Sequence, residues 1–64
     1  MDFIYALVFG SELEDIIIII SKEDAIKQSI NYPNHRVEIF SKTNSIGYTP
    51  TYNYYKNGEF IQNS

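Results

Sequence analysis

The stretch EDIIIIISKED, residues 14–24, places five consecutive isoleucines between two acidic clusters. β-Branched side chains lose χ1 freedom in a helix, so a run of this kind favours a β-strand. Successive side chains of a strand point to opposite faces of its sheet. We therefore predict a strand over Ile16–Ile20 that is apolar on both faces, with Ile17 and Ile19 on one face and the other three isoleucines on the opposite one.

The segments on either side of this run predict a hairpin and a helix. Residues 3–9, FIYALVF, are β-branched and aromatic, and a short connection joins them to the isoleucines, which favours an antiparallel hairpin. Ser21 and Asp24 fit a helix-capping pattern, so we expect a helix from Lys22 to Asn31 that ends before Pro33. Its apolar stripe is narrow and consists of Ala25, Ile26, Ser29 and Ile30.

The second half of the chain predicts further strands. Residues 35–41 and 51–55 are rich in strand-forming residues, and residues 43–47 are expected to form the loop between them. Asn57-Gly58 is the strongest short hairpin signal and predicts a type I′ turn before a short strand over residues 59–61. The expected fold is α+β, one domain over residues 1–64, in the order β-β-α-β-β with a short final strand. One helix would pack on one face of a mostly antiparallel sheet.

The length of the chain limits how it can be stabilised. A domain of 64 residues falls below the roughly 70–80 residues at which one core commonly supplies more than about 3–5 kcal/mol. Cysteine is absent, which excludes disulfides and thiolate metal sites. A partner chain is the remaining common source of stability.

The isoleucine run indicates where such a partner chain would bind. One helix covers one face of the sheet, and the sequence alone does not identify that face. We assign Ile17 and Ile19 to the uncovered face and predict that they contact a second copy in a symmetric homodimer. Burying one isoleucine is worth about 1.5–3 kcal/mol. Two alternatives are that aromatic residues of the C-terminal hairpin fold over this face, or that an unrelated protein covers it.

A tyrosine-rich stretch gives a second candidate surface. Four tyrosines lie within residues 48–55, and we predict that Tyr52, Tyr54 and Tyr55 take part in a protein interface. Strand pairing within the core is an alternative use for the same rings. A further alternative is a single-stranded nucleic-acid site formed by Arg36, Tyr52, Tyr54 and Lys56. The net charge of −3 argues against that last reading, since phosphate binding relies on lysine and arginine.

Residues that carry chemistry are sparse. His35 is the only histidine, and no serine lies in a nucleophile-elbow motif. Glu12, Glu14 and Asp15 lack a calcium-loop pattern and are more typical of solvated acids that protect a sticky strand from aggregation. We therefore expect no catalytic residues, no metal, no cofactor and no enzymatic activity.

The C-terminal half, chiefly RVEIF at 36–40 and GYTPTYNYYKNGE at 47–59, resembles short uncharacterised proteins of large DNA viruses. This resemblance implies a small viral accessory protein and brings no activity or site residues. The start of the chain lacks a basic leader region, and its apolar stretches are shorter than the about 20 residues that span a membrane. We thus expect a cytoplasmic location, in the host cell if the chain is viral, no membrane partner, and a non-enzymatic protein-interaction module.

Overall fold

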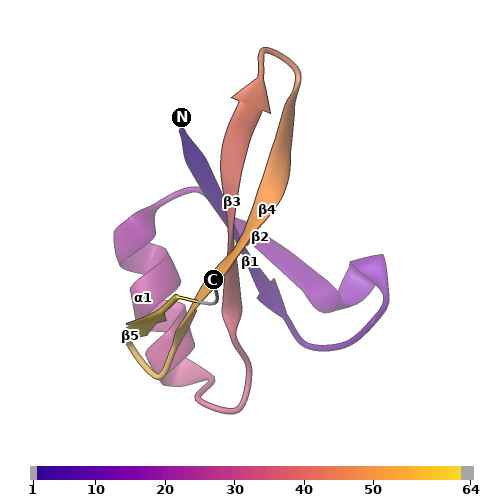
Figure 1. Cartoon of the computed structure of the whole chain (residues 1–64). Helices are drawn as coiled ribbons and strands as arrows, with labels where there is room; N and C mark the ends of the chain where they lie inside the picture. Colours follow the sequence, from indigo (N-terminus) through magenta and orange to yellow (C-terminus); the bar gives the residue numbers. More distant parts are fainter. Residues whose placement is uncertain (1, 63–64) are drawn as a thin grey trace.

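The computed structural model describes residues 2–62, which form one antiparallel five-stranded sheet and one α-helix (Figure 1). The strand order is β2-β1-β3-β4-β5. The predicted α+β fold is confirmed, with the helix packed against the sheet. The elements are β1 (Phe3–Val8), a 3-10 turn η1 (Leu13–Asp15), β2 (Ile16–Ile19), α1 (Lys22–Asn31), β3 (Val37–Asn44), β4 (Gly47–Lys56) and β5 (Glu59–Ile61).

Strand β1 occupies an inner position and pairs with two neighbours. Leu7 lies opposite Ile17 of β2 on one side and opposite Val37 of β3 on the other. The β1–β2 hairpin therefore forms as predicted. Its second strand lies at one edge of the sheet, while β4 and β5 lie at the other.

The helix begins and ends where the local sequence signals predict. The Ser21 hydroxyl accepts a hydrogen bond from the Asp24 amide, and the helix stops at Asn31, two residues before Pro33. Ala25 and Ser29 are its buried residues. A narrow stripe of this kind covers only part of one sheet face.

The last turn docks onto the helix through a single buried hydroxyl. Asn57 and Gly58 have φ values of 51° and 83°, as the predicted type I′ turn requires. The Ser29 hydroxyl donates to the Ile26 carbonyl at 2.7 Å and accepts from the Gly58 amide at 2.9 Å. The C-terminal hairpin is therefore fixed to α1 by a satisfied hydrogen-bond pair.

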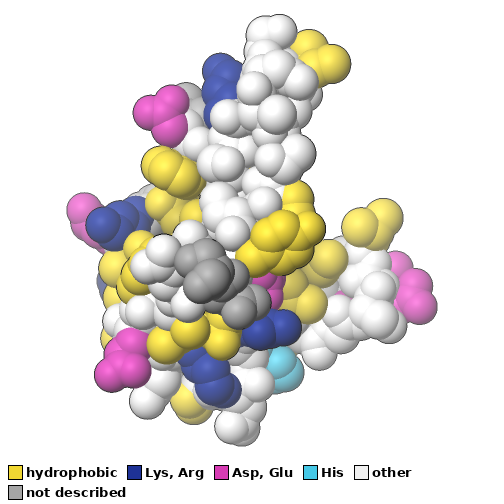
Figure 2. All heavy atoms as spheres, in the orientation of Figure 1, with side chains coloured by type: hydrophobic (Ala, Val, Ile, Leu, Met, Phe, Trp, Pro, Cys, Tyr) yellow, Lys and Arg dark blue, Asp and Glu magenta, His cyan; other side chains and the backbone are white. Residues whose placement is uncertain are grey.

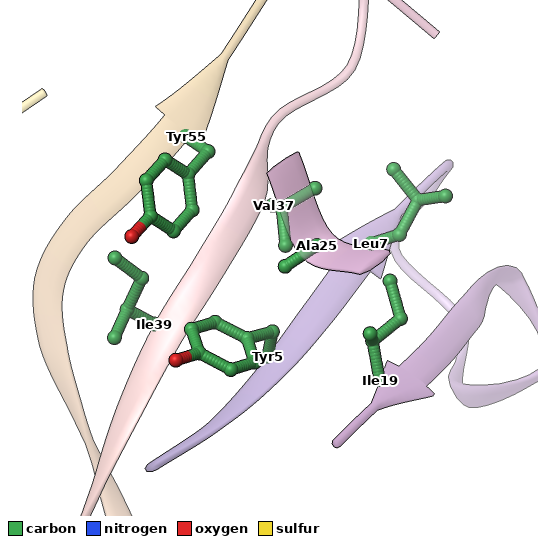
Figure 3. Close-up of a cluster of buried hydrophobic side chains, with 7 residues drawn as sticks. All are labelled: Tyr5, Leu7, Ile19, Ala25, Val37, Ile39 and Tyr55. Atoms are coloured by element: carbon green, nitrogen blue, oxygen red, sulfur yellow. The ribbon is translucent and has the colours of Figure 1, made fainter. Parts of the chain in front are cut away.

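The hydrophobic core lies between the helix and the sheet (Figure 3). Leu7, Val37 and Ala25 are almost fully buried at its centre. Around them Tyr5 and Tyr55 tilt toward each other, with ring centroids 6.2 Å apart. The core side chains are Tyr5, Leu7, Ile19, Ala25, Val37, Ile39 and Tyr55.

Strands β3 and β4 are longer than the sequence predicts. The expected loop over residues 43–47 is mostly strand, and the chain reverses at Ser45 and Ile46. The Thr43 and Thr49 hydroxyls meet at 2.6 Å across the hairpin, and the Asn44 side chain accepts from the Ile46 amide. These polar contacts extend the hairpin as an arm that projects beyond the rest of the sheet (Figure 1).

Candidate interaction surface

Strand β2 exposes apolar side chains on both of its faces. Ile17 is 51% exposed, Ile18 58%, and Ile20, just beyond the strand, 63%. A groove of about 500 Å³ runs along this strand, with residues 17–20 on one side and Asp24 and Gln28 of the helix on the other. Contiguous exposed apolar surface of this kind is typical of an interaction site.

The two faces are the reverse of those predicted for the isoleucines. Ile19 is only 8% exposed and packs in the core under the helix. Ile17 shares its face, because side chains alternate along a strand. The prediction that Ile19 lies on the uncovered face is therefore wrong, and Ile16 and Ile18 occupy that face instead. Ile17 remains exposed because α1 packs mainly over β1, β3 and β4.

The backbone of β2 is also unpaired along its outer edge. The Phe9 amide donates to the Asp15 carbonyl at 2.8 Å, which identifies these residues as a hydrogen-bonded pair. Such pairs alternate in an antiparallel ladder, so Ile17 and Ile19 are the β2 residues that bond to β1. Ile16 and Ile18 consequently direct their N–H and C=O groups away from β1, toward an edge with no neighbouring strand among residues 2–62.

The C-terminal hairpin does not cover this strand. β4 and β5 lie at the opposite end of the sheet, separated from β2 by β1 and β3. Phe60 contacts Tyr55 with ring centroids 5.8 Å apart and stays 54% exposed. The alternative in which aromatic residues of this hairpin shield the isoleucines is thus ruled out within the protomer.

The three tyrosines predicted at an interface lie in three different environments. Tyr55 is 6% exposed and belongs to the core, so its assignment to an interface is wrong. Tyr54 is half-buried beneath the Arg36 guanidinium, whose carbon lies 4.7 Å from the ring centroid. Tyr52 is 64% exposed and is the one of the three that a partner could reach freely.

Tyr52 lies in a β-bulge. β3 and β4 shift register between Glu38 and Phe40, so that three residues of β4 lie opposite Ile39 alone. The Thr51 hydroxyl donates to the Ile39 carbonyl at 2.8 Å and accepts from the Asn53 amide at 3.1 Å. Tyr52 adopts φ of 67°, a strained conformation for a bulky residue. Bulges redirect side chains, and here an aromatic ring is held outward at a conformational cost.

Replacing Tyr52 by asparagine should stabilise the fold. Asparagine tolerates the left-handed backbone conformation, which costs most other residues about 1–2 kcal/mol. We expect Tyr52→Asn to raise the unfolding free energy by about 1 kcal/mol in urea denaturation. Tyr52→Ala is the matched control, since it removes the ring without gaining that tolerance. A Tyr52→Asn protein less stable than Tyr52→Ala would contradict this account.

Three of the four residues proposed for nucleic-acid binding come together. Arg36, Tyr54 and Lys56, with Asn34, line a groove of about 270 Å³, while Tyr52 is not among its lining residues. Arg36 bonds to Glu38 at 2.8 Å and stacks on Tyr54, and the Lys56 ammonium donates to the Pro33 carbonyl. The groove is thus basic, but its arginine and its aromatic face already have partners within the chain.

The residues weighed for catalysis or metal binding have structural contacts. The His35 ring packs against Phe9, with centroids 5.0 Å apart, and lines none of the grooves described here. Asp15 accepts from the Glu12 amide and closes the η1 turn. Among residues 2–62, no group of three potential ligands is placed to hold a metal ion. Over the same residues, no helix has the length and apolarity needed to cross a membrane.

The stability of the fold should fall in strong alkali through Tyr5. Burial, and secondly the nearby Tyr55 phenol, raise the pKa of Tyr5 above its usual value of 10.0. The pKa of Tyr5 is higher in the folded state than in the unfolded state, so ionisation of this phenol favours unfolding. The contribution of neutral Tyr5 to the free energy of unfolding is therefore fully present below pH 10.0 and is lost as the pH rises through the folded-state pKa. Denaturant unfolding at a series of alkaline pH values should show this loss, and Tyr5→Phe should lose less than wild type. Identical slopes for the two proteins would refute it.

Comparisons with known proteins find no matching family model, no similar curated protein and no similar solved structure. The fold and the surface are therefore interpreted on their own physical features. They define a small α+β protein with an apolar strand, β2, at one edge of its sheet, and the outer side of that strand has no neighbouring strand among residues 2–62.

Proposed function

We propose that this protein is a small, non-enzymatic interaction module that associates with itself. The observation that carries the proposal is the exposure of Ile17, Ile18 and Ile20 by more than half, on both faces of an edge strand. Full burial of an exposed isoleucine is worth about 1.5–3 kcal/mol, and more than half of each of these side chains is still exposed, so their burial together would add a large share of what so small a core supplies. An apolar edge left in water is also an aggregation hazard, so a defined partner is favoured.

A charge placed on β2 tests this proposal. Ile18→Lys should give a monomer by light scattering after size exclusion, because the substitution replaces an apolar contact by a charge and brings the like charges of the two copies together. Ile46→Lys is the matched control. Ile46 is 92% exposed in the turn between β3 and β4, where Figure 2 shows hydrophobic atoms at the tip of the arm. An Ile18→Lys protein that associates as wild type does would contradict the proposal.

Tyr52 is the proposed contact for a second protein. Its ring is exposed on a strained bulge of β4, and β4 and β2 are separated by two strands. Self-association through β2 would leave this ring free. A viral accessory role in the host-cell cytoplasm is proposed on the sequence resemblance of residues 36–59 alone.

Binding of single-stranded nucleic acid is the second candidate, because Arg36, Tyr54 and Lys56 share one groove. Fluorescence anisotropy with a labelled oligonucleotide separates the two functions. Phosphate contacts predict affinity that falls steeply as salt rises, and Lys56→Gln should lower the salt dependence. An absence of binding at low salt would eliminate this candidate.

A further inference from the structure

We propose that the second copy binds at the outer edge of β2, by antiparallel pairing of the two β2 strands, so that two five-stranded sheets join into one. This inference rests on the self-association proposed above and names the atoms that carry it. The outward N–H and C=O groups of Ile16 and Ile18 would form the new ladder. Pairing at a free edge supplies backbone hydrogen bonds in addition to apolar burial.

Edge pairing explains why isoleucines are exposed on both faces. Ile17 lies on the helix face and Ile18 on the other, and both are more than half exposed. Stacking of two sheets face to face would cover only one of these side chains. The helix-free face also carries the Arg36–Glu38 ion pair against Tyr54, which is unsuited to an apolar face-to-face interface. A strand added at the edge contacts both faces together.

The run of isoleucines is self-complementary about its centre. Pairing centred on Ile18 places Ile18 opposite its own copy, and Ile17 opposite Ile19 of the second copy, because paired residue numbers have a constant sum in an antiparallel ladder. Each exposed isoleucine then meets another isoleucine. Such a two-fold arrangement uses the same surface on both copies, as a symmetric dimer requires.

The opposite edge of the sheet explains why association would stop at two copies. β5 is only Glu59–Ile61, and it pairs with β4 only over Tyr54–Lys56. The rest of the β4 edge contains Pro50 and the bulge at Tyr52. Short strands, proline and bulges all discourage pairing at an edge. A dimer joined through β2 therefore has no second good edge with which to extend into a fibre.

Ile18→Pro tests the backbone contribution. Proline removes the outward N–H of residue 18 but no hydrogen bond to β1, and an edge strand tolerates it in that orientation. Ile18→Val is the matched control, since it keeps the N–H and a β-branched side chain. We expect wild type and Ile18→Val to be dimers and Ile18→Pro to be a monomer with an unchanged far-ultraviolet circular dichroism spectrum. A folded Ile18→Pro dimer would overturn the inference.

Amide hydrogen exchange of the wild type tests the same point without a substitution, and decides it if Ile18→Pro unfolds. At concentrations where the protein is dimeric, the amides of Ile16 and Ile18 should be protected, and dilution to monomer should expose them. The amides of Ile17 and Ile19 should stay protected at both concentrations. A dimer with unprotected Ile16 and Ile18 amides overturns edge pairing alone, whereas a protein that is monomeric at every concentration overturns the proposed self-association as well.

Discussion

Leu7→Ala should leave the protein largely unfolded at 25 °C. The Leu7 side chain is 1% exposed, on the inner strand β1, between Ile17 and Val37 on the neighbouring strands. Truncation of a buried leucine costs about 2–5 kcal/mol, through lost burial and the cavity left behind. Since a domain of this size has about 3–5 kcal/mol from its core, little stability would remain. Urea denaturation followed by circular dichroism measures the loss.

The chain contains a matched control for this substitution. Leu13 in the η1 turn is 85% exposed, so Leu13→Ala removes the same atoms from a site where they contribute little burial. We expect this variant to unfold at nearly the wild-type urea concentration. Both proteins must be compared at one protein concentration, because dimerisation contributes to apparent stability. Equal losses for the two substitutions would show that Leu7 is not in the core.

Ser29→Ala should cause the second largest loss, about 1–3 kcal/mol, because a part-buried amide would lose its acceptor. The Ser29 side chain is fully buried and accepts from the Gly58 amide at 2.9 Å. Gly58 cannot easily move to find another acceptor, since it lies against Ile30 at φ of +83°. The substitution should also speed hydrogen exchange at Gly58, which links the loss of stability to this particular contact.

Ser45→Ala serves as the control for Ser29→Ala. Ser45 is exposed in the turn between β3 and β4, so removal of its hydroxyl leaves no buried donor without a partner. Its unfolding free energy should match that of wild type. A Ser29→Ala protein as stable as Ser45→Ala, with unchanged exchange at Gly58, would mean that the helix does not hold the turn.

Local signals in the sequence were sufficient to predict several elements. The helix has the predicted bounds because Ser21 caps one end and Pro33 limits the other, and both act within a few residues. Asn57-Gly58 forms the predicted turn because its two residues set the required φ values by themselves. The isoleucine run is a strand because of its β-branched side chains, although it ends at Ile19 rather than Ile20.

The features that the sequence did not predict depend on contacts between distant residues. Alternation separates Ile17 and Ile19 from Ile18, but only packing against Tyr5, Leu7 and the helix decides which set is buried. The strand order likewise depends on the pairing of β1 with β3, in which Leu7 lies opposite Val37. No local signal in the sequence specifies a pairing between residues so far apart along the chain.

The tyrosines were misjudged for a more local reason. Tyr54 and Tyr55 are consecutive and therefore point to opposite faces of β4, and Tyr55, opposite Val37, faces the core. The bulge opposite Ile39 shifts the register of β4 without changing which face the later residues occupy. Thr51 and Asn53 are the residues from which the bulge could have been predicted, because short polar side chains of this type bond to nearby backbone and interrupt regular strand pairing. Tyr52 is consequently the candidate contact that remains exposed.

Sedimentation equilibrium of the wild-type protein over a range of concentrations is the most direct test of the central claim. One short helix leaves both faces of β2 incompletely covered, as the exposure of Ile17 and Ile18 shows. We therefore expect a reversible monomer–dimer equilibrium, with twice the mass of one chain at the higher concentrations and no larger species. A stable, folded protein with the mass of one chain at every concentration would contradict it.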